Sequence, residues 1–378
     1  MSGAPRIAAI DTFHVSVPVR PLADGGIAPY RGSQDPTGVS SAGSLLVAVR
    51  ADDGTTGWGE MNTGFPAAVD RALMHDWAAP ALLGQPVGNV QALIERLDSP
   101  YWPHLGRRAL ASAVETALWD LLGRHLDAPV STLLGGALRT SIPLAPCLGL
   151  TSIEQACGYA VDVLARGHRV LKTKIATDVE EAVERVRAIT DVTGGRLRLR
   201  LDANQALTRT AAAELATRLA GLPVEYIEQP LPVADVDGMR MLRQRSAVPV
   251  AINEDAYLLT GVVDAVRADA TDAAVVDLEP AGGIGGLVTL ARTAQSLRLP
   301  LAHHCGWDLG VKAAAMAHVV AAVPAFTLAS DSTYAEHLDD VLERRLEIAD
   351  GAMRVPQGPG LGITVDEDKV RALAAEES

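Results

Sequence analysis

Charged residues and a histidine recur at the ends of short apolar runs, and this periodicity constrains the fold more than any other feature. In chain order these residues are Lys174, Asp202, Glu228, Glu254, Asp277, His304 and Asp331. Successive members lie 23 to 28 residues apart, which leaves room for a strand of about five residues, two loops and a helix. Such a repeat closes most simply into a (β/α)8 barrel, in which the C-terminal ends of the strands meet at one mouth. The sequence therefore predicts an α/β fold with an active site at that mouth.

The length and charge of the chain narrow the classes of partner. With 378 residues the chain is long enough for a large core and two domains. A formal net charge of −13 argues against nucleic acid and membranes as partners, although a bound cation can still attract an anionic substrate. No apolar run approaches the roughly 20 residues of a membrane-spanning helix, and the N-terminal segment lacks signal-peptide features. The three cysteines have no metal-ligand spacing, so we predict a cytoplasmic protein.

The segment before the barrel predicts a separate α+β domain. Residues 1–128 are expected to form this N-terminal capping domain. Strands are predicted at 6–16 and at 44–60, the second as a hairpin that turns at the sequence DDG. The residues within 64–126 have the periodicity of helices.

Three further segments complete the predicted organisation. Residues 17–43, which include Tyr30, are rich in Gly, Pro and Ser and are predicted to be a lid loop, with a disordered insertion as the alternative. The (β/α)8-type catalytic domain is assigned to residues 129–340. The tail, residues 341–378, contains a further hairpin signal and is expected to return and pack on the capping domain.

Three of the acids are candidates for a metal site. Asp202, Glu228 and Glu254 end consecutive strands, so their carboxylates are expected to converge. Convergent carboxylates repel one another unless a hard divalent cation such as Mg2+ binds between them. The alternative is that one or two point outward and form surface pairs. Asn253 and Asp255 flank Glu254 and also carry ligating oxygens, so the third ligand stays open among these three residues.

Two lysines on one strand are candidates for a base. Lys172 and Lys174 lie two residues apart, so both side chains face the same side of the strand. Two ammonium groups close together near a cation are expected to lower the pKa of at least one, which makes a lysine usable as a base near neutral pH. We therefore predict that both residues are catalytic.

A second acid/base is predicted across the barrel. Asp277 and His304 end neighbouring strands, and a carboxylate bound to one imidazole nitrogen fixes the tautomer and raises the basicity of the other. His303 is a competing candidate, for which a satisfied core or rim histidine is the plainer interpretation. Asp331 is expected to orient the imidazole or contact substrate, with an ordinary loop acid or cap as the alternative. Glu279 is expected to lie in a loop.

A cation flanked by two opposed bases suits removal of the proton next to a carboxylate. The positive charge would stabilise the enediolate that forms when this proton leaves. Reprotonation on the other face would give racemisation, whereas loss of a β-hydroxyl would give dehydration. The sequence therefore predicts an enzyme whose partner is a small-molecule carboxylic acid.

These segments resemble the enolase superfamily, and more closely its mandelate racemase/muconate lactonizing enzyme branch. The resemblance rests on the order and spacing of SAVETALWDLLGRHLDAPVSTLLGG, LKTKI, LRLDANQAL, YIEQPL, VDLEPAGGIGG, AHHCGWDLG and PGLGITVD. It implies a modified TIM barrel, with an N-terminal capping domain completed by the C-terminal tail. It also implies that loops around 17–35 and 55–65 close over the barrel, that one Mg2+ ion binds (with Mn2+ as an alternative), and that the protein is a homo-oligomer.

The candidate residues are assigned by combining their chemistry with this resemblance. Catalysis is assigned to Lys172, Lys174, Asp277 and His304, the metal to Asp202, Glu228 and Glu254, and substrate binding to Asn204, Asp331 and Tyr30. The pattern is similar to the mandelate racemase-type subgroup. Two departures from the patterns of the family's subgroups matter. The sixth strand lacks the lysine of the muconate lactonizing and dipeptide epimerase subgroups. Asp331 stands near the place of the subgroup's glutamate, and with Asn253 this is similar to the glucarate dehydratase pattern.

The predicted function follows from that subgroup. We predict a hydro-lyase that removes water from a sugar acid. The alternative is a racemase or epimerase of a 2-hydroxy or related carboxylic acid, which would use the same residues. A third hypothesis is a catalytically inactive binding protein with the enolase fold. The identity and stereochemistry of the substrate and the size of the oligomer lie beyond the sequence.

Overall fold

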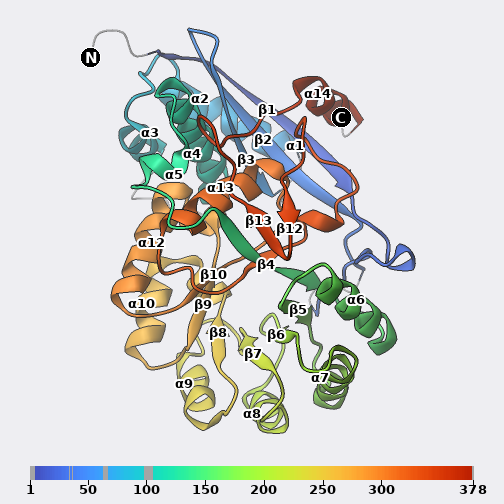
Figure 1. Ribbon diagram of the computed structural model, residues 1–378. Helices are drawn as coiled ribbons and strands as arrows, with labels where there is room; N and C mark the ends of the chain where they lie inside the picture. Colours follow the sequence, from blue (N-terminus) through green and yellow to red (C-terminus); the bar gives the residue numbers. More distant parts are fainter. Residues whose placement is uncertain (1–4, 34, 36, 63–66, 98–104, 377–378) are drawn as a thin grey trace.

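The computed structural model describes residues 5–33, 35, 37–62, 67–97 and 105–376. It contains a three-stranded antiparallel sheet above a barrel of parallel strands, as Figure 1 shows. The sheet has the order β1-β2-β3, with bounds Ile7–Pro18, Ser41–Ala51 and Thr56–Asn62. The predicted hairpin turn between β2 and β3 is confirmed at Gly54, whose φ of 88° lies in the region that favours glycine. Among the described residues, no helix is long and apolar enough to cross a membrane.

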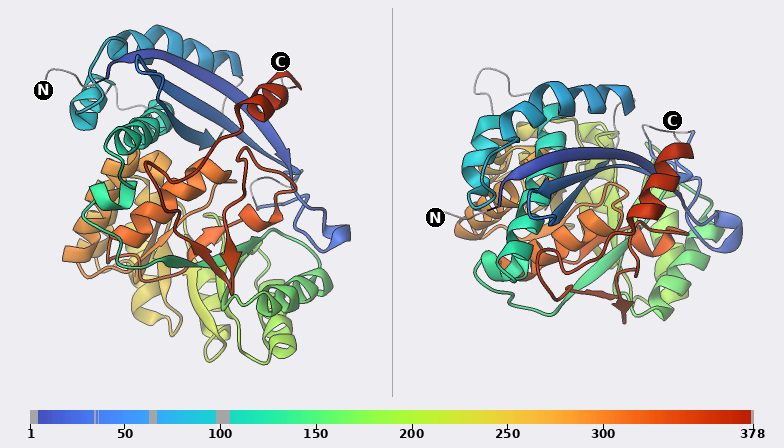
Figure 2. Two further views of the ribbon diagram at one scale, coloured as in Figure 1. Left: turned by 45° about the horizontal axis from the view of Figure 1, so that its top comes forward. Right: turned by 90° about the horizontal axis from the view of Figure 1, so that it is seen from above.

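Helices pack on this sheet at close range. They are α1 (Ala67–Leu73), a π-helical turn (Met74–Ala78), α2 (Ala79–Leu82), α3 (Val90–Leu97) and α4 (Leu105–His125). A Cβ atom on Gly59 of β3 would lie 1.7 Å from the carbonyl oxygen of Ala113 in α4. Only glycine permits this approach, which brings α4 against β3. Figure 2 shows the helices of this part of the chain beside the three-stranded sheet.

The eight strands of the predicted barrel are present and parallel. They are β4 (Ser141–Leu148), β5 (Val170–Lys174), β6 (Arg198–Asp202), β7 (Val224–Glu228), β8 (Val250–Ile252), β9 (Ala273–Val276), β10 (Leu301–His303) and β11 (Ser330–Ser332). Neighbours in sequence pair from β4 through β10, and β11 pairs with β4. A bridge between Leu301 and Phe326 connects β10 to the segment that leads into β11. The capped (β/α)8 fold predicted from the repeat is therefore confirmed.

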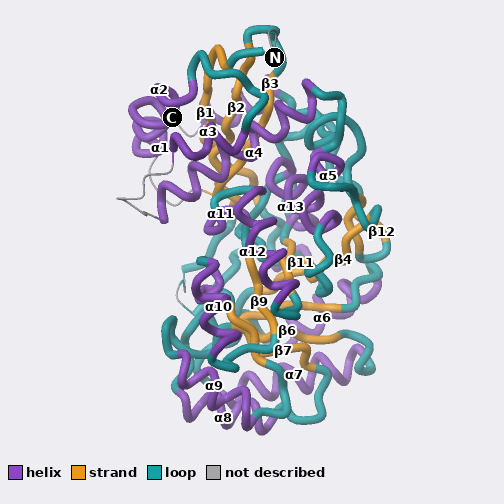
Figure 3. Tube along the Cα trace, turned by 90° about the vertical axis from the view of Figure 1, so that its left-hand side faces the viewer, coloured by secondary structure: helices purple, strands orange, loops and turns teal. Residues whose placement is uncertain are grey.

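Helices connect and surround the strands. They are α5 (Val130–Leu133) before the barrel, then α6 (Ile153–Ala165), α7 (Val179–Thr193), α8 (Arg209–Arg218), α9 (Val236–Arg245), α10 (Leu259–Arg267), α11 (Leu278–Ala281), α12 (Ile284–Ser296) and α13 (Gly310–Ala322). Val183, Val186 and Ile189 of α7 are fully buried, as expected for the inner stripe of an amphipathic helix. Figure 3 shows that α11 and α13 lie between the three-stranded sheet and the barrel strands.

The C-terminal tail returns along the barrel before it reaches the sheet. A short hairpin of β12 (Ile348–Ala349) and β13 (Ala352–Arg354) pairs antiparallel with β4. Helix α14 (Glu367–Glu376) then packs on β1, and Glu367 forms an ion pair with Arg50 of β2 at 2.9 Å. The hairpin of the tail thus extends the barrel, the segment after it bonds to α4 through Leu361 N–H and Asp120 Oδ1 at 2.7 Å, and the last helix packs on the sheet. The domain boundaries near residues 128 and 340 stay a prediction.

Buried acids from the sheet and α4 cap two barrel helices. Glu60 of β3 accepts hydrogen bonds from the backbone N–H groups of Leu309 and Lys312 at 2.7 and 2.8 Å, at the start of α13. Glu115 of α4 accepts from Ile284 and Gly285 at 2.6 and 2.8 Å, at the start of α12. Burial raises the pKa of Glu60 to about 8 and that of Glu115 to about 7. These contacts fix the two helices that flank β10 against the sheet.

The raised pKa of Glu115 makes the stability of the protein depend on pH. Because the folded pKa exceeds the ordinary value of 4.5, the contribution is present below the unfolded pKa and is lost as pH rises through about 7. As the pH rises from about 4.5 to 8, the unfolding free energy of the parent protein should fall by roughly 2 to 3 kcal/mol more than that of the Glu115→Gln variant. Denaturant unfolding at several pH values measures this, with exposed Glu95→Gln as control. Parallel pH profiles for the Glu115 variant and the parent protein would contradict it.

Candidate active site

Parallel register places the candidate residues side by side at one end of the barrel. Lys174 of β5 pairs with Asp202 of β6, and Asp202 pairs with Glu228 of β7. Two residues earlier, Lys172 of β5 is in register with Arg200 of β6. Because alternate residues of a strand share a face, both rows lie on the same side of the sheet.

Lys172 forms three buried ion pairs. Its Nζ atom lies 2.6 Å from Glu228 Oε1, 2.9 Å from Asp331 Oδ2 and 3.0 Å from Asp202 Oδ2. Burial by itself lowers the pKa of Lys172, but the three carboxylates outweigh burial and raise this pKa well above its ordinary value. The three acids around Lys172 therefore act against a lowered pKa at this residue, while the lowering expected for one of the two lysines beside a cation stays a prediction.

Lys174 lies beside a predicted substrate residue. Its Nζ atom donates to Asp202 Oδ2 at 2.6 Å and to Asn204 Oδ1 at 2.5 Å, and its side chain is 12% exposed. Burial favours the protonated form of Asp202, but Lys172 and Lys174 hold the pKa of this carboxyl well below its usual range. Burial, together with the charge of Asp202, raises the pKa of Glu228 to about 7. Neighbouring acids on adjacent strands therefore have opposite shifts.

The three carboxylates predicted to bind a metal do not form one cluster. Asp202 and Glu228 share Lys172, whereas Glu254 Oε1 accepts a hydrogen bond from Asn204 Nδ2 at 3.3 Å. Within the described ranges, no three His, Cys, Asp or Glu side chains are grouped as metal ligands. In this same part of the chain, Glu228 and Glu254 each keep a buried Oε2 atom without a hydrogen-bond partner. A buried carboxylate oxygen is rarely left unpaired, so both atoms fit a cation-binding role.

The contacts around Glu254 separate the three candidates for the third ligand. Asp255 uses both oxygens to hold the loop that follows β7, accepting from Gln229 Nε2 at 2.8 Å and from the backbone N–H of Ala234 at 2.9 Å. Asn253 donates from Nδ2 to the carbonyl oxygen of Val275 at 3.0 Å. These contacts turn Asp255 away from the other acids and favour Glu254.

The predicted pair of Asp277 and His304 is formed. His304 Nδ1 lies 3.0 Å from Asp277 Oδ2, which leaves Nε2 as the nitrogen that Asp277 does not engage. Burial lowers the pKa of His304, but the hydrogen bond to Asp277 prevails and raises it above the ordinary value. His303, by contrast, is fully buried, and burial lowers its pKa. The competing candidate is therefore a core histidine, but not a satisfied one, because among the described residues neither of its ring nitrogens has a hydrogen-bond partner.

Asp331 is engaged by two buried cations. Its Oδ2 contacts Lys172 as described, and its Oδ1 lies 2.9 Å from Arg200 Nη1. Arg200 is fully buried, forms a second ion pair with Glu225 at 2.6 Å, and stacks over the ring of Tyr226 at 4.9 Å. Since both oxygens of Asp331 are used inside the barrel, its surroundings favour a role in holding Lys172 over direct contact with substrate.

The predicted lid loop reaches the strand ends through its described residues. Tyr30 and Val39 form a backbone bridge, and the ring of Tyr30 stands edge-on to Trp307 at 5.0 Å. The backbone carbonyl oxygen of Arg31 accepts a hydrogen bond at 2.7 Å from the N–H of Leu150, which lies just after β4. Burial raises the pKa of Tyr30 well above its usual value. These contacts favour a lid over a disordered insertion, while residues 34, 36 and 63–66 of the two predicted loops lie outside the described residues.

Lys312 and Glu279 belong to the site but were missed or misplaced by sequence reasoning. Glu279, predicted to lie in a loop, lies in the four-residue helix α11, and its Oε1 contacts Lys312 Nζ at 2.7 Å. Lys312 also contacts Asp277. A single lysine in the otherwise apolar helix α13 was the available signal. Arg200 was also missed. Its position two residues before Asp202 on the same strand was the signal that its side chain shares a face with Asp202.

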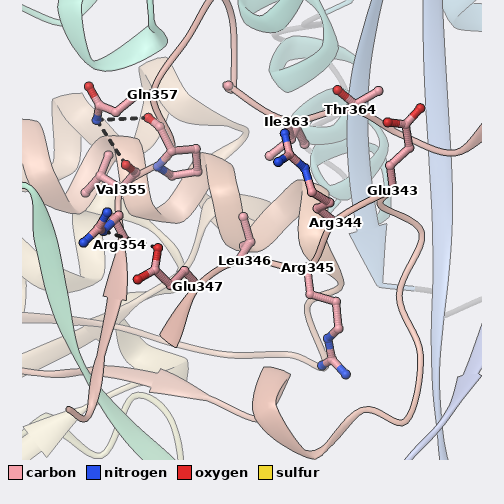
Figure 4. Close-up of a pocket in the computed structure, with 12 residues that line it drawn as sticks. Glu343, Arg344, Arg345, Leu346, Glu347, Arg354, Val355, Gln357, Ile363 and Thr364 are labelled. Atoms are coloured by element: carbon pink, nitrogen blue, oxygen red, sulfur yellow. Dashed lines mark hydrogen bonds and ion pairs between the residues drawn. The ribbon is translucent and has the colours of Figure 1, made fainter. Parts of the chain in front are cut away.

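A surface pocket lies apart from these residues, in the C-terminal tail. Its volume is about 560 Å3, and Figure 4 shows the side chains that line it. Arg354 and Glu347 form an ion pair there at 3.4 Å. Arg345 is committed to the carbonyl oxygens of Tyr334 and His337, at 2.7 Å each. No residue assigned to the active site lines this pocket.

Two family models match the chain. The model described as "Mandelate racemase / muconate lactonizing enzyme, N-terminal domain" matches residues 28–135, and "Enolase C-terminal domain-like" matches residues 155–369. The chain is also 29% identical over 370 residues to the chloromuconate cycloisomerase of Pseudomonas sp. (strain P51), covering 97% of this chain and 98% of that protein.

Other relatives carry different activities. The D-galactarolactone cycloisomerase of Agrobacterium fabrum is 29% identical over 86% of this chain and 89% of its own length. The L-Lys-D/L-Arg epimerase of Methylococcus capsulatus is 30% identical over 85% of this chain and 90% of its own length. Among solved structures, the muconate lactonizing enzyme of Pseudomonas fluorescens complexed with muconolactone superposes with a TM-score of 0.89, at 25% identity, over 98% of this chain and 99% of that one.

The buried arginine of β6 gives a stability prediction. Arg200→Met removes the cation shared by Glu225 and Asp331 and leaves two buried carboxylates with less compensation. We expect the unfolding free energy to fall by about 3 to 5 kcal/mol in denaturant titrations. Arg198→Met is the matched control, because Arg198 is 59% exposed on the same strand and lies 3.6 Å from Glu225. Equal stabilities of the two variants would show that the buried pairs contribute nothing beyond the exposed one.

Proposed function

Because the chain belongs to the mandelate racemase/muconate lactonizing enzyme family of the enolase superfamily, we propose that it removes the proton next to the carboxylate of a small carboxylic acid. We propose further that the substrate is a sugar acid and that the reaction is the loss of water. The observation that carries this proposal is the hydrogen-bonded pair of Asp277 and His304, which leaves one imidazole nitrogen not engaged by Asp277 and follows β9 and β10, strands that do not neighbour β5 with Lys174. Two proton-transfer groups on opposite sides of one mouth suit elimination across a carbon–carbon bond.

A divalent cation belongs to the proposal. Asp202, Glu228 and Glu254 would hold Mg2+, with Mn2+ as an alternative, and the unpaired Oε2 atoms of the two glutamates support this assignment. When bound, the ion supplies positive charge where negative charge develops on the substrate carboxylate. Lys172, which is buried among three acids, would add a second positive charge to this part of the site.

The protein's own groups would move the protons. Lys174 in its neutral form takes the α-proton, and the C–H electron pair passes into the enediolate. His304 in its protonated form gives a proton to the β-hydroxyl, whose C–O bond breaks so that water leaves. The resulting enol then takes up a proton at the β-carbon and loses its hydroxyl proton, which gives a 2-keto acid. Asp277 holds the imidazole in place and favours its protonated form.

Two observations support dehydration of a sugar acid. The sixth barrel strand leads into Asp277, where the cycloisomerase and dipeptide epimerase subgroups have a lysine. One relative is named for D-galactarolactone, a sugar-acid lactone. Together they favour a hydroxylated acid as substrate and His304 as the acid for its leaving hydroxyl. A cytoplasmic homo-oligomer is proposed with the same function.

Racemisation or epimerisation is the second candidate. It is supported by the relative named L-Lys-D/L-Arg epimerase and by the same two opposed bases. In this reaction His304 would return the proton to the opposite face of the α-carbon. A catalytically inactive binding protein is the third candidate, and the intact set of candidate residues argues against it.

A substrate screen in deuterated water separates these candidates. With Mg2+ and a library of mono- and diacid sugars, we expect at least one member to give a 2-keto product. Lys174→Ala should lower the rate about 10²- to 10⁴-fold. His304→Asn should stop elimination but retain deuterium uptake at the α-carbon, because Lys174 still removes the proton. His75→Asn, whose side chain is 86% exposed, is the control. Deuterium uptake without keto acid in the parent protein would instead favour the racemase.

Metal binding can be tested without a substrate. Titration of the chelator-treated protein with Mg2+, followed calorimetrically, should show one site per chain. Glu254→Gln should weaken this binding at least tenfold, because it replaces a charged ligand oxygen with an amide. Asp255→Asn should bind Mg2+ as the parent protein does, since both carboxylate oxygens of Asp255 accept hydrogen bonds from the loop that follows β7. The reverse order of the two variants would reassign the third ligand, and the absence of binding would favour the inactive protein.

A further inference from the structure

Lys312 is a fully buried lysine that the proposed reaction does not use. It lies in the first turn of α13, its side chain is 1% exposed, and three carboxylates surround it. Its Nζ atom lies 2.7 Å from Glu279 Oε1, 2.9 Å from Asp308 Oδ1 and 3.2 Å from Asp277 Oδ1. A buried ammonium is tolerated only when it is paired, and here the pairing is threefold.

The carboxylate of Asp277 is shared between Lys312 and the candidate acid. One of its oxygens receives His304 Nδ1 at 3.0 Å, and Lys312 Nζ lies 3.2 Å from the other. Burial lowers the pKa of Lys312, but the acids prevail and raise it well above its ordinary value. Lys312 therefore stays charged and is unsuited to act as a base. What it can do is keep Asp277 ionised and fix the plane of its carboxylate.

Two residues near the end of β3 hold Lys312 in turn. Glu279 Oε1, which contacts Lys312 Nζ, also accepts a hydrogen bond from the backbone N–H of Asn62 at 2.8 Å. The backbone N–H of Lys312 donates to Glu60 Oε2 at 2.8 Å. Gly306 lies directly beside Asn62 and has no room for a side chain, because a Cβ atom there would lie 2.1 Å from Asn62 Nδ2. A continuous chain of polar contacts thus connects β3 to the imidazole of His304.

We propose that Lys312 is a positioning residue for the Asp277–His304 pair, and that through Glu279 it couples this pair to the end of β3. The catalytic meaning of the coupling rests on the proposed function, whereas the coupling itself does not. The charged and titratable groups that face this network come from several elements and loops around it. They are Asp277, Glu279, His303, His304, Asp308, Lys172, Asp331 and Glu60.

The test is the pKa of His304, measured in the full-length protein without a substrate. Histidine labelled with 13C at Cε1 gives one NMR signal per residue, and the His304→Asn variant assigns the signal of interest. Lys312→Met removes a positive charge next to Asp277 and should raise the pKa of His304 by about one unit. Glu279→Gln removes a negative charge from the same network and should lower it. Lys369→Met is the control. It removes a lysine of the tail that is paired with Asp339, and it should leave the pKa of His304 unchanged.

Opposite shifts in the two variants would support the coupling, because a purely structural role of Lys312 gives no reason for shifts of opposite sign. An unchanged pKa of His304 in both folded variants would overturn it. If Lys312→Met does not fold, Glu279→Gln decides alone, since it keeps the shape of the side chain and an oxygen that can accept from Asn62. Opposite shifts together with a failed substrate screen would leave the coupling intact and refute only the proposed reaction.

Discussion

The pairing of Lys172 with three acids is the interaction on which the rest of the site depends. Asp202, Glu228 and Asp331 come from β6, β7 and β11, so one ammonium holds carboxylates from three strands in one place. Without it the acids would repel one another in a buried setting, where their charges are weakly screened. Parallel register brings these residues to the same level, and charge compensation keeps them there.

A second cluster repeats this arrangement on the other side of the barrel. Lys312 is surrounded by Asp277, Glu279 and Asp308, again one buried lysine among three acids. The two clusters differ in what else they contact. The first includes acids with unpaired oxygens, which fit a cation, whereas the second is linked to an imidazole. In the proposed reaction, the first cluster would hold the substrate's negative charge and the second would supply a proton.

The sequence predicted the barrel and most of the site because both follow from a short-range repeat. The interval between functional residues located the strands from β5 to β11, and side-chain alternation placed Lys172 and Lys174 on one face. Contacts between distant segments could not be predicted in this way. Lys312 reaches Asp277 from a helix, so no strand periodicity indicated it. The pKa of Lys172 could not be predicted either, because its direction depends on how many acids fold around it. The choice at Glu254 was open because β8 ends at Ile252, beyond which alternation no longer applies.

The two halves of the mouth are anchored to the rest of the chain by different means. The half that carries Asp277 and His304 is tied to the capping domain by buried hydrogen bonds, since Glu60 of the sheet caps α13 and Glu115 of α4 caps α12. The half that carries the lysines is contacted by the loop around Tyr30, whose neighbours bond to the backbone after β4 and β6, while the Tyr30 ring itself reaches Trp307 after β10. Loops tolerate changes of sequence and conformation that buried caps do not. A change of substrate is therefore easier to accommodate on the lysine side, whereas the geometry of the proposed acid is fixed by the core that joins the sheet to the barrel.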